Sequence, residues 1–246
     1  HELVSLVLNN KREIIMRKTI LAIGAFMSIP AMSSAHDIDL EPHNPEEIVE
    51  DREGNRYRTV TIGKQVWLAE NLRSTKFQDG SKITTAFIAN DDPKNLLQYG
   101  RLYDWHDATD KRNICPIGWR VASDDDWKEL EKTIGVPEED LDKKGWRGKK
   151  DIAITLKETQ PDTAFKKFDQ SQVNKYNFSA RASGIKWKRW YFAQGLYSEY
   201  WTSSEANAKD AYNRTLAYSW WNMHKGQIYR TTLSKNYMFA VRCIKN

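Results

Sequence analysis

Metal-binding side chains are scarce in this sequence. The 246 residues include two cysteines and five histidines, and none of them stands at the spacing of a zinc-ligand pair. Catalytic and nucleotide-binding fingerprints are absent too: there is no G-x-S-x-G, no P-loop and no dinucleotide-binding glycine motif. We therefore expect no resident metal and no cofactor, and we assign no catalytic residue.

One group of oxygen-bearing side chains is dense enough to bind a cation. Asp104, His106, Asp107 and Asp110 lie close together in the sequence. Carboxylates are ligands that a hard cation such as Ca²⁺ prefers. A solvated loop after a strand explains the same residues without a metal, and we expect that arrangement.

The sequence also lacks a hydrophobic run long enough to span a membrane. Its clearest apolar stretch, about residues 20–31, follows a basic pair at 17–18 and precedes small residues at 33–35. This order is typical of a secretory signal peptide, whereas a retained transmembrane helix needs a longer apolar run. We expect a signal peptide at 16–35 and interpret 1–15 as a leader that contributes nothing to the fold. The mature chain then has no membrane span.

Charge is not concentrated in any part of the chain. The formal net charge is +5, and removal of residues 1–35 leaves about +3, because four basic and two acidic residues leave with them. A spread charge of this size argues against a nucleic-acid partner, which needs a basic face. The remaining chain fits one domain. We expect a monomer with an extended tail at 36–56 and a folded domain at 57–246.

Short strands are predicted at both ends of this domain. Alternating residues over 57–62, a Gly-containing turn and an apolar run at 65–68 predict an opening hairpin. Segments 211–220, 226–233 and 237–244 are rich in aromatic and β-branched residues, which predicts three more strands. The last segment is apolar on both faces, which indicates a central position in a sheet.

A helix is predicted between these groups of strands. Ser123, with an acidic residue three positions later, is a variant of the capping box that begins a helix. Trp127, Leu130 and Ile134 then form one buried stripe, and a glycine and a proline follow as a stop. A second, shorter helix is predicted at 152–158. Helices followed by short antiparallel strands and long loops indicate an α+β fold.

Several phrases of the chain occur in an order that is similar to a known family. They are CPIGWRVASDDDW at 115–127, YWTSSE at 200–205 and FAVRCI at 239–244, with further agreement at 60–72, 99–105, 145–148, 156–159 and 178–181. Over roughly residues 57–246 the chain resembles the domain family named for the major paralogues of Fibrobacter succinogenes. The resemblance implies a secreted, periplasmic or surface-attached bacterial domain. It also implies a C-type-lectin-like fold related to the formylglycine-generating-enzyme superfold, and no established activity.

The two cysteines, Cys115 and Cys243, are expected to form one disulfide. An exported chain meets an oxidising environment, in which paired cysteines are usually bridged. Such a bridge would join the entrance of the predicted helix to the last strand. Two buried thiols are the alternative.

Aromatic residues crowd one third of the chain. Their faces stack on the apolar side of sugar rings, and polar neighbours suggest that some of them lie on exposed loops. The candidate ligand-binding residues are Trp187, Trp190, Tyr197, Trp221 and Asn222. Ordinary core packing is the alternative, and we expect it for Trp201. Arginines amid the aromatic residues are expected to stack on rings or to pair with buried acids; they are Arg181, Arg214 and Arg242.

Two mechanisms known for related folds do not match these residues. The sequence Trp221-Asn222 is followed by Met223 rather than by an acid, and the nearest Glu-Pro motif lies in the tail at 41–44, so the calcium-lectin motifs are missing. A bridged Cys115 would leave no thiolate for the chemistry of the formylglycine-generating relatives. We expect an exported, non-catalytic module that binds a polysaccharide or another cell-surface ligand without calcium. An enzyme of the formylglycine-generating superfold and a purely structural envelope protein are the alternatives.

Overall fold

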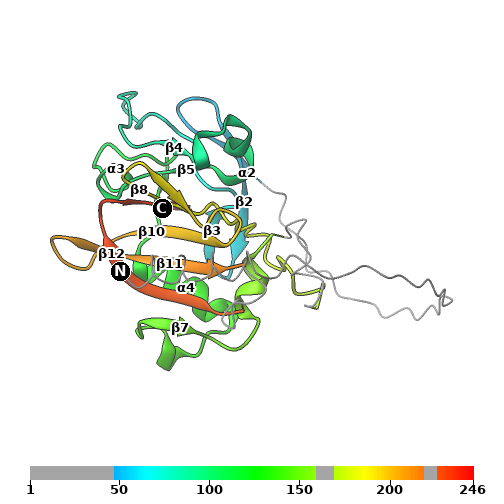
Figure 1. The fold of residues 1–246 in the computed structure, drawn as a ribbon. Helices are drawn as coiled ribbons and strands as arrows, with labels where there is room; N and C mark the ends of the chain where they lie inside the picture. The colour runs from blue at the N-terminus through cyan, green and yellow to red at the C-terminus, as the bar shows by residue number, and fades with distance from the viewer. Residues whose placement is uncertain (1–46, 159–168, 219–225) are drawn as a thin grey trace, which may run out of the picture. The chain divides into compact units, whose positions relative to one another are not determined.

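The computed structural model describes residues 47–158, 169–218 and 226–246. Figure 1 shows short strands arranged in several small sheets around one principal helix, α4. The fold is α+β with antiparallel sheets and few short helices, which confirms the predicted class. The predicted signal peptide, Trp221 and Asn222 lie outside the described residues. Within the described part, no helix is both long and apolar enough to cross a membrane.

A five-stranded sheet joins the beginning of the described chain to its end. All its pairings are antiparallel. The hairpin β2–β3 is the predicted one, and its turn places Gly63 at φ 60°, a left-handed backbone angle that favours glycine. β14 lies inside the sheet between β3 and β6, as expected for a strand that is apolar on both faces. The order of the strands in this sheet is β1 (Ile48–Glu50), β2 (Arg56–Ile62), β3 (Gln65–Leu68), β14 (Cys243–Lys245) and β6 (Trp119–Val121).

The folded unit begins before the predicted boundary at Tyr57. β1 pairs with β2, and the buried carboxylate of Asp51 accepts a hydrogen bond of 2.8 Å from the Tyr57 hydroxyl. A strand of three residues carries too little periodicity to be recognised in the sequence. Glu47, just before β1, lies 3.4 Å from the Lys245 ammonium at the end of β14. The two ends of the folded unit are therefore adjacent.

A second sheet contains the longest strands. Two of its strands, β11 (Asp210–Ala217) and β12 (Ile228–Ser234), correspond to the predicted strands at 211–220 and 226–233, of which residues 219–220 lie outside the described part. The third predicted strand, 237–244, is instead divided into β13 and β14, because Phe239 bridges to Tyr103 and Ala240 bridges to Tyr200 between the sheets. The order of the second sheet is β10 (Tyr197–Glu205), β11 (Asp210–Ala217), β12 (Ile228–Ser234) and β7 (Gly145–Arg147).

Two smaller sheets complete the strand inventory of the described residues. One pairs two strands and the other three, and the three-stranded sheet carries several aromatic residues. They consist of β4 (Phe87–Ile88) with β5 (Arg101–Leu102), and of β13 (Tyr237–Met238), β8 (Ile185–Trp187) and β9 (Trp190–Phe192) in that order.

The principal helix, α4 (Asp124–Ile134), begins and ends as predicted. Ser123 forms a capping box with Asp126, and Gly135 at φ 105° ends the helix in the left-handed conformation. The predicted stripe of Trp127, Leu130 and Ile134 is buried. The other helical segments of the described residues are short: η1 (Ala89–Asp91), η2 (Pro93–Asn95), α2 (Leu96–Tyr99), α3 (Trp105–Ala108), η3 (Glu138–Asp140) and η4 (Ile152–Leu156).

The second predicted helix is a short 3-10 helix, η4, rather than an α-helix through residue 158. Its backbone leaves the helical path because Lys157 forms a parallel bridge with Ala180. The Glu158 N–H then donates to the Ala180 carbonyl at 3.0 Å. Tertiary pairing therefore ends the helix earlier than the local pattern indicates.

Aromatic rings fill the centre of the core. Trp127 lies 5.4 Å from Trp67 and 5.6 Å from Phe178, measured between ring centroids. Tyr200 lies 5.3 Å from Trp127 on the other side. Edge-to-face and tilted contacts at these distances are the favourable geometries for aromatic pairs. Trp201, the next residue on β10, is fully buried, as the sequence predicts.

A buried arginine, Arg242, closes this core. Its guanidinium lies 4.2 Å from the Phe178 ring centroid and donates to the Asn71 side chain at 2.8 Å. Further hydrogen bonds go to the backbone carbonyls of Leu68, Phe178 and Ser179. Burial lowers the pKa of Arg242, and these neutral acceptors solvate its charge without a carboxylate.

Two acids of α4 face three arginines of the second sheet. Asp124 receives hydrogen bonds from Arg214 at 2.7 Å and from Arg230 at 2.6 Å. Glu131 receives them from Arg214 at 2.5 Å and from Arg147. Each of these five side chains is at most 5 % exposed. We call them the buried ion cluster, and they confirm the prediction that Arg214 pairs with buried acids.

One disulfide, Cys115–Cys243, links the loop before β6 to β14. The sulfur atoms are 2.01 Å apart and the sequence separation is 128 residues. The bond confirms the predicted pairing and leaves neither cysteine free. It therefore covalently closes the five-stranded sheet.

Candidate binding face

Three aromatic side chains form a row across the three-stranded sheet. In its register Tyr237 is opposite Trp187, and Trp187 is opposite Trp190. Residues directly opposite each other on adjacent antiparallel strands project from the same face. We call Tyr237, Trp187 and Trp190 the aromatic row.

The aromatic row extends from the surface toward the core. Trp190 is 54 % exposed, whereas Trp187 and Tyr237 are half-buried and stack with their ring centroids 6.0 Å apart. Tyr237 stacks on Phe239 at 5.8 Å, and Phe239 packs on Trp201 at 4.3 Å. Because Phe239 and Trp201 are fully buried, the exposed indole neighbours a chain of packed rings that holds the face in place.

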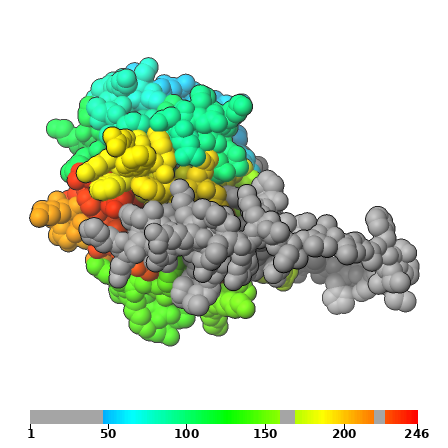
Figure 2. Space-filling model, viewed as in Figure 1, coloured from blue at the N-terminus to red at the C-terminus, as the bar shows by residue number. Residues whose placement is uncertain are grey.

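The opposite face of the β8–β9 hairpin is anchored to the domain. The Lys186 ammonium lies 4.2 Å from the Tyr191 ring centroid and 4.6 Å from that of Phe87. The Tyr191 hydroxyl donates to Asp91, and burial followed by this hydrogen bond raises the pKa of Tyr191. Figure 2 shows the yellow atoms of this part of the chain at the surface, beside blue-green atoms from an earlier segment. The hairpin is thus fixed through one face and presents the other.

Two cations form the turn at the tip of this hairpin. Lys188 and Arg189 lie between β8 and β9, and both are exposed. The Lys188 ammonium is 4.7 Å from the Trp187 ring centroid, and the Arg189 guanidinium carbon is 4.8 Å from that of Trp190. Two indoles of the aromatic row therefore have a positive charge over their rings.

Tyr197, another predicted ligand-binding residue, does not join the row. Tyr197 lies on β10, opposite Ala217, and is 2 % exposed. Its ring is therefore enclosed by the protein rather than presented to a ligand. Trp221 and Asn222 lie outside the described residues.

Sequence reasoning missed Tyr237 as a member of the row. Its partner Trp187 is distant in the chain, and the register that makes them neighbours is not visible in the sequence. The available signal was the alternation of Tyr237 with Phe239, which indicates a strand with aromatic residues on one face.

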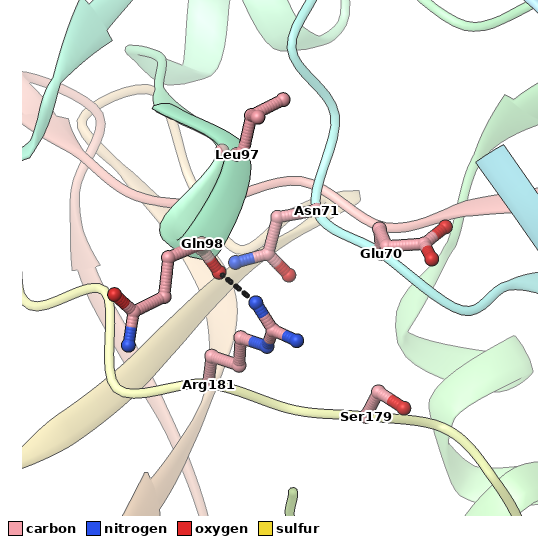
Figure 3. Close-up of a pocket in the computed structure, with 7 residues that line it drawn as sticks. Glu70, Asn71, Leu97, Gln98, Ser179 and Arg181 are labelled. Atoms are coloured by element: carbon pink, nitrogen blue, oxygen red, sulfur yellow. Dashed lines mark hydrogen bonds between the residues drawn. The ribbon is translucent and has the colours of Figure 1, made fainter. Parts of the chain in front are cut away.

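A small pocket elsewhere on the surface has its polar groups already paired. It encloses about 210 Å³, partly open to solvent. Figure 3 shows Arg181 directed at the Gln98 carbonyl, to which it donates at 3.2 Å. Arg181 also forms an ion pair with Glu158, and Glu70 pairs with Arg58 at 2.7 Å. Internal contacts thus occupy the groups that a ligand would need. The lining residues are Glu70, Asn71, Leu97, Gln98, Gly100, Ser179 and Arg181.

A larger depression of about 440 Å³, also partly open to solvent, lies beside the disulfide. The Gln78 side chain spans its floor and donates to the carbonyls of Cys115 and Pro116, both at 3.0 Å. Acidic and basic side chains are mixed along its walls, including Glu50 and Lys76. These charges do not converge on one point, and we assign no ligand to this depression.

The acidic group at 104–110 serves the fold. The Asp107 carboxylate accepts four hydrogen bonds from the backbone and hydroxyls of residues 84–85. Asp104 caps α3, and Asp110 pairs with Arg112 at 2.8 Å. Within the described residues, no group of three side chains could hold a metal ion.

Comparison with known proteins places the chain in a family. The family model described as the Fibrobacter succinogenes major domain matches residues 60–245. The chain belongs to this family. No curated protein matches the sequence, and no solved structure matches it.

In this Fibrobacter succinogenes major domain, several phrases that carry the resemblance meet around Arg242. Its side chain bonds to Asn71 and Leu68 from the phrase at 60–72, and to Phe178 from the phrase at 178–181. The Asn71 amide donates onward to a carbonyl in the phrase at 99–105. These phrases therefore build the core, and the aromatic row lies outside all of them.

Proposed function

We propose that this domain is an exported, monomeric and non-catalytic binding module that holds a polysaccharide or another cell-surface ligand on the aromatic row. The observation that carries the proposal is the in-register alignment of Tyr237, Trp187 and Trp190 on one face of a sheet. The exposed indole of Trp190 offers a stacking surface to a sugar ring, and no metal is needed for that contact.

The covalent chemistry of the domain supports a non-catalytic role. Cys115 and Cys243 are bonded to each other, so neither supplies the thiolate that a cysteine nucleophile requires. The disulfide also suits an oxidising compartment, which supports export to the periplasm or the cell surface. The same bond and the meeting of β2, β3 and β14 in one sheet support the finer assignment of a C-type-lectin-like fold.

Substituting Trp190 with alanine tests the proposal. We expect retention on insoluble polysaccharides to weaken roughly tenfold, because one stacked aromatic contact contributes about 1.5 kcal/mol. The melting temperature should stay nearly unchanged, since the indole is exposed. The measurement is a pull-down of the exported, disulfide-bonded protein on cellulose, xylan, chitin and peptidoglycan, with and without a calcium chelator.

Ile117→Ala is the matched control, because Ile117 is an exposed apolar residue outside the aromatic row. It should leave retention unchanged. Equal retention of the W190A variant and the parent protein would contradict the proposal. Retention that disappears with the chelator would contradict binding without calcium, and no retention on any polymer would favour a protein partner or a structural role.

A further inference from the structure

The turn of the β8–β9 hairpin holds a lysine in an unfavourable backbone conformation. Lys188 has φ 51°, in the left-handed region. Glycine and asparagine adopt this region at low cost, whereas a long side chain is strained there by roughly 1 kcal/mol. Two-residue hairpin turns accordingly favour Asn-Gly and related pairs. The chain thus places a cation where hairpin stability alone favours glycine.

The charges at this turn have no acidic partner among the residues that the structure describes. Neither Lys188 nor Arg189 forms an ion pair with a carboxylate of the described residues. Asp91 contacts the same hairpin, but it receives the hydroxyl of Tyr191. Tyr191 follows Trp190 in β9 and projects from the opposite face. The positive charge beside the aromatic row is therefore available to a ligand.

These cations lie over the same indoles on which a sugar would stack. A pyranose that lies on an indole directs its ring substituents outward, past the rim of the aromatic system. The Lys188 ammonium and the Arg189 guanidinium carbon lie 4.7 and 4.8 Å from the centroids of Trp187 and Trp190. A guanidinium binds a carboxylate through two parallel hydrogen bonds, and these are stronger than bonds to neutral hydroxyls.

We infer that the aromatic row binds an acidic polysaccharide with uronate carboxylates, and that Lys188 and Arg189 select it over the corresponding neutral polymer. This inference rests on the proposed function, because it assigns a ligand class to the same face. The rings supply contact area, and the two cations supply the discrimination.

Polygalacturonate and its fully methyl-esterified form provide the test, since they share one sugar backbone and differ in charge. At low ionic strength we expect the exported, disulfide-bonded protein to bind the acid form at least about tenfold more tightly. Lys188→Gly and Arg189→Gln should each weaken binding to the acid form roughly three- to tenfold and leave binding to the ester unchanged.

The Lys188→Gly variant separates binding from stability. Glycine relieves the left-handed backbone angle, so we expect the melting temperature of K188G to equal or exceed that of the parent protein while its affinity falls. Lys149→Gln, at an exposed lysine outside the row, is the matched control and should change neither quantity.

Four outcomes would overturn the inference. Equal binding of acid and ester, both weakened by Trp190→Ala, would leave the proposed function standing without a charge preference. Binding of neutral polysaccharides alone would likewise leave the proposed function standing and would contradict the preference for an acidic polymer. Binding to polygalacturonate that Trp190→Ala does not weaken, and that poly-L-glutamate competes equally well, would indicate charge attraction without sugar recognition. Binding to no polysaccharide would also remove polysaccharides from the proposed function and would favour a protein partner or a structural role.

Discussion

Substituting Arg214 with alanine should lower the free energy of unfolding by about 3–5 kcal/mol, because it leaves two buried carboxylates without their shared partner. The Arg214 side chain is fully buried and bonds both Asp124 and Glu131. Burial alone would raise the pKa of Asp124, but hydrogen bonds from Arg230 and the charge of Arg214 outweigh it and hold that pKa below its usual value. Removal of the Arg214 guanidinium takes away part of the stabilisation that keeps the buried Asp124 carboxylate ionised.

The loss should persist when the positive charge is kept. Arg214→Lys retains the charge, but a single ammonium cannot reproduce the two-sided contact of a planar guanidinium with Asp124 and Glu131. We therefore expect Arg214→Lys to lose most of the stability that Arg214→Ala loses.

Urea denaturation with the disulfide intact measures both variants. Arg56→Ala is the control: its ion pair with Glu50 is exposed, and exposed pairs contribute little. If Arg214→Ala lowered the free energy of unfolding no more than Arg56→Ala, water or a rearranged side chain would have to stabilise the carboxylates of Asp124 and Glu131. The buried ion cluster would then not be a stabilising feature.

Raising the pH from about 4.5 to about 8 should destabilise the protein through one buried side chain, Glu199. It lies on β10 and is fully buried. Its Oε2 atom accepts from the Asn213 amide at 3.0 Å and from the Thr215 hydroxyl at 2.7 Å. Burial raises the pKa of Glu199 from 4.5 to about 8, against the opposing effect of these two hydrogen bonds.

The unpaired atoms around Glu199 identify where its proton belongs. Glu199 Oε1 and Asn213 Oδ1 are both buried and have no hydrogen-bond partner. Two acceptors cannot bond each other, but a proton on Oε1 converts that atom into a donor. We therefore expect protonated Glu199 to donate to Asn213 Oδ1, which would complete a cyclic acid–amide pair with the bond from the Asn213 amide.

The direction of the pH effect follows from this assignment. Below about 4.5 the carboxyl is protonated in both the folded and unfolded states and favours neither. Between pH 4.5 and about 8 the Glu199 carboxyl is ionised in the unfolded state and protonated in the folded state. The free energy of unfolding therefore falls by up to about 1.4 kcal/mol for each pH unit in this window and levels off above it.

Glu199→Gln should remove this dependence while preserving the pair, because a glutamine amide can also donate to Asn213 Oδ1 and accept from its amide. At pH 8 we expect the variant to exceed the parent protein by several kcal/mol, at most about 5. Urea denaturation at pH 5 and pH 8 makes the comparison, and Glu129→Gln, at an exposed position on α4, should retain the parental slope. Parallel pH profiles for E199Q and the parent protein would show that Glu199 does not hold the proton.

Local signals were sufficient for the elements that form from neighbouring residues. The cap at Ser123, the stripe from Trp127 to Ile134 and the stop at Gly135 all lie within one short segment, and α4 forms there. The β2–β3 hairpin is set in the same way by its own turn. The disulfide was predictable for a different reason, because the expected signal peptide and a count of two cysteines favour one pairing.

Features made by distant segments were not predictable to the same extent. Trp190 and Tyr197 are both predicted ligand-binding residues, yet Trp190 is exposed and Tyr197 is buried. The sheet in which each strand pairs decides this difference, and a single sequence does not contain the register. For the same reason, the sequence did not predict the partners of Arg230 or the burial of Glu199. Both depend on how β10, β11 and the rest of the core pack together.

The ion pair between Glu47 and Lys245 has a consequence for how this domain can be used within a longer polypeptide. A compact unit whose entry and exit lie side by side can be inserted into a host loop, or strung in tandem copies, without stretching its neighbours. The spacing between the connecting segments is then fixed by β1 and β14, which belong to one sheet. Several copies of such a unit along one polypeptide would carry several aromatic rows. Weak contacts that these rows make at the same time would combine into stronger attachment.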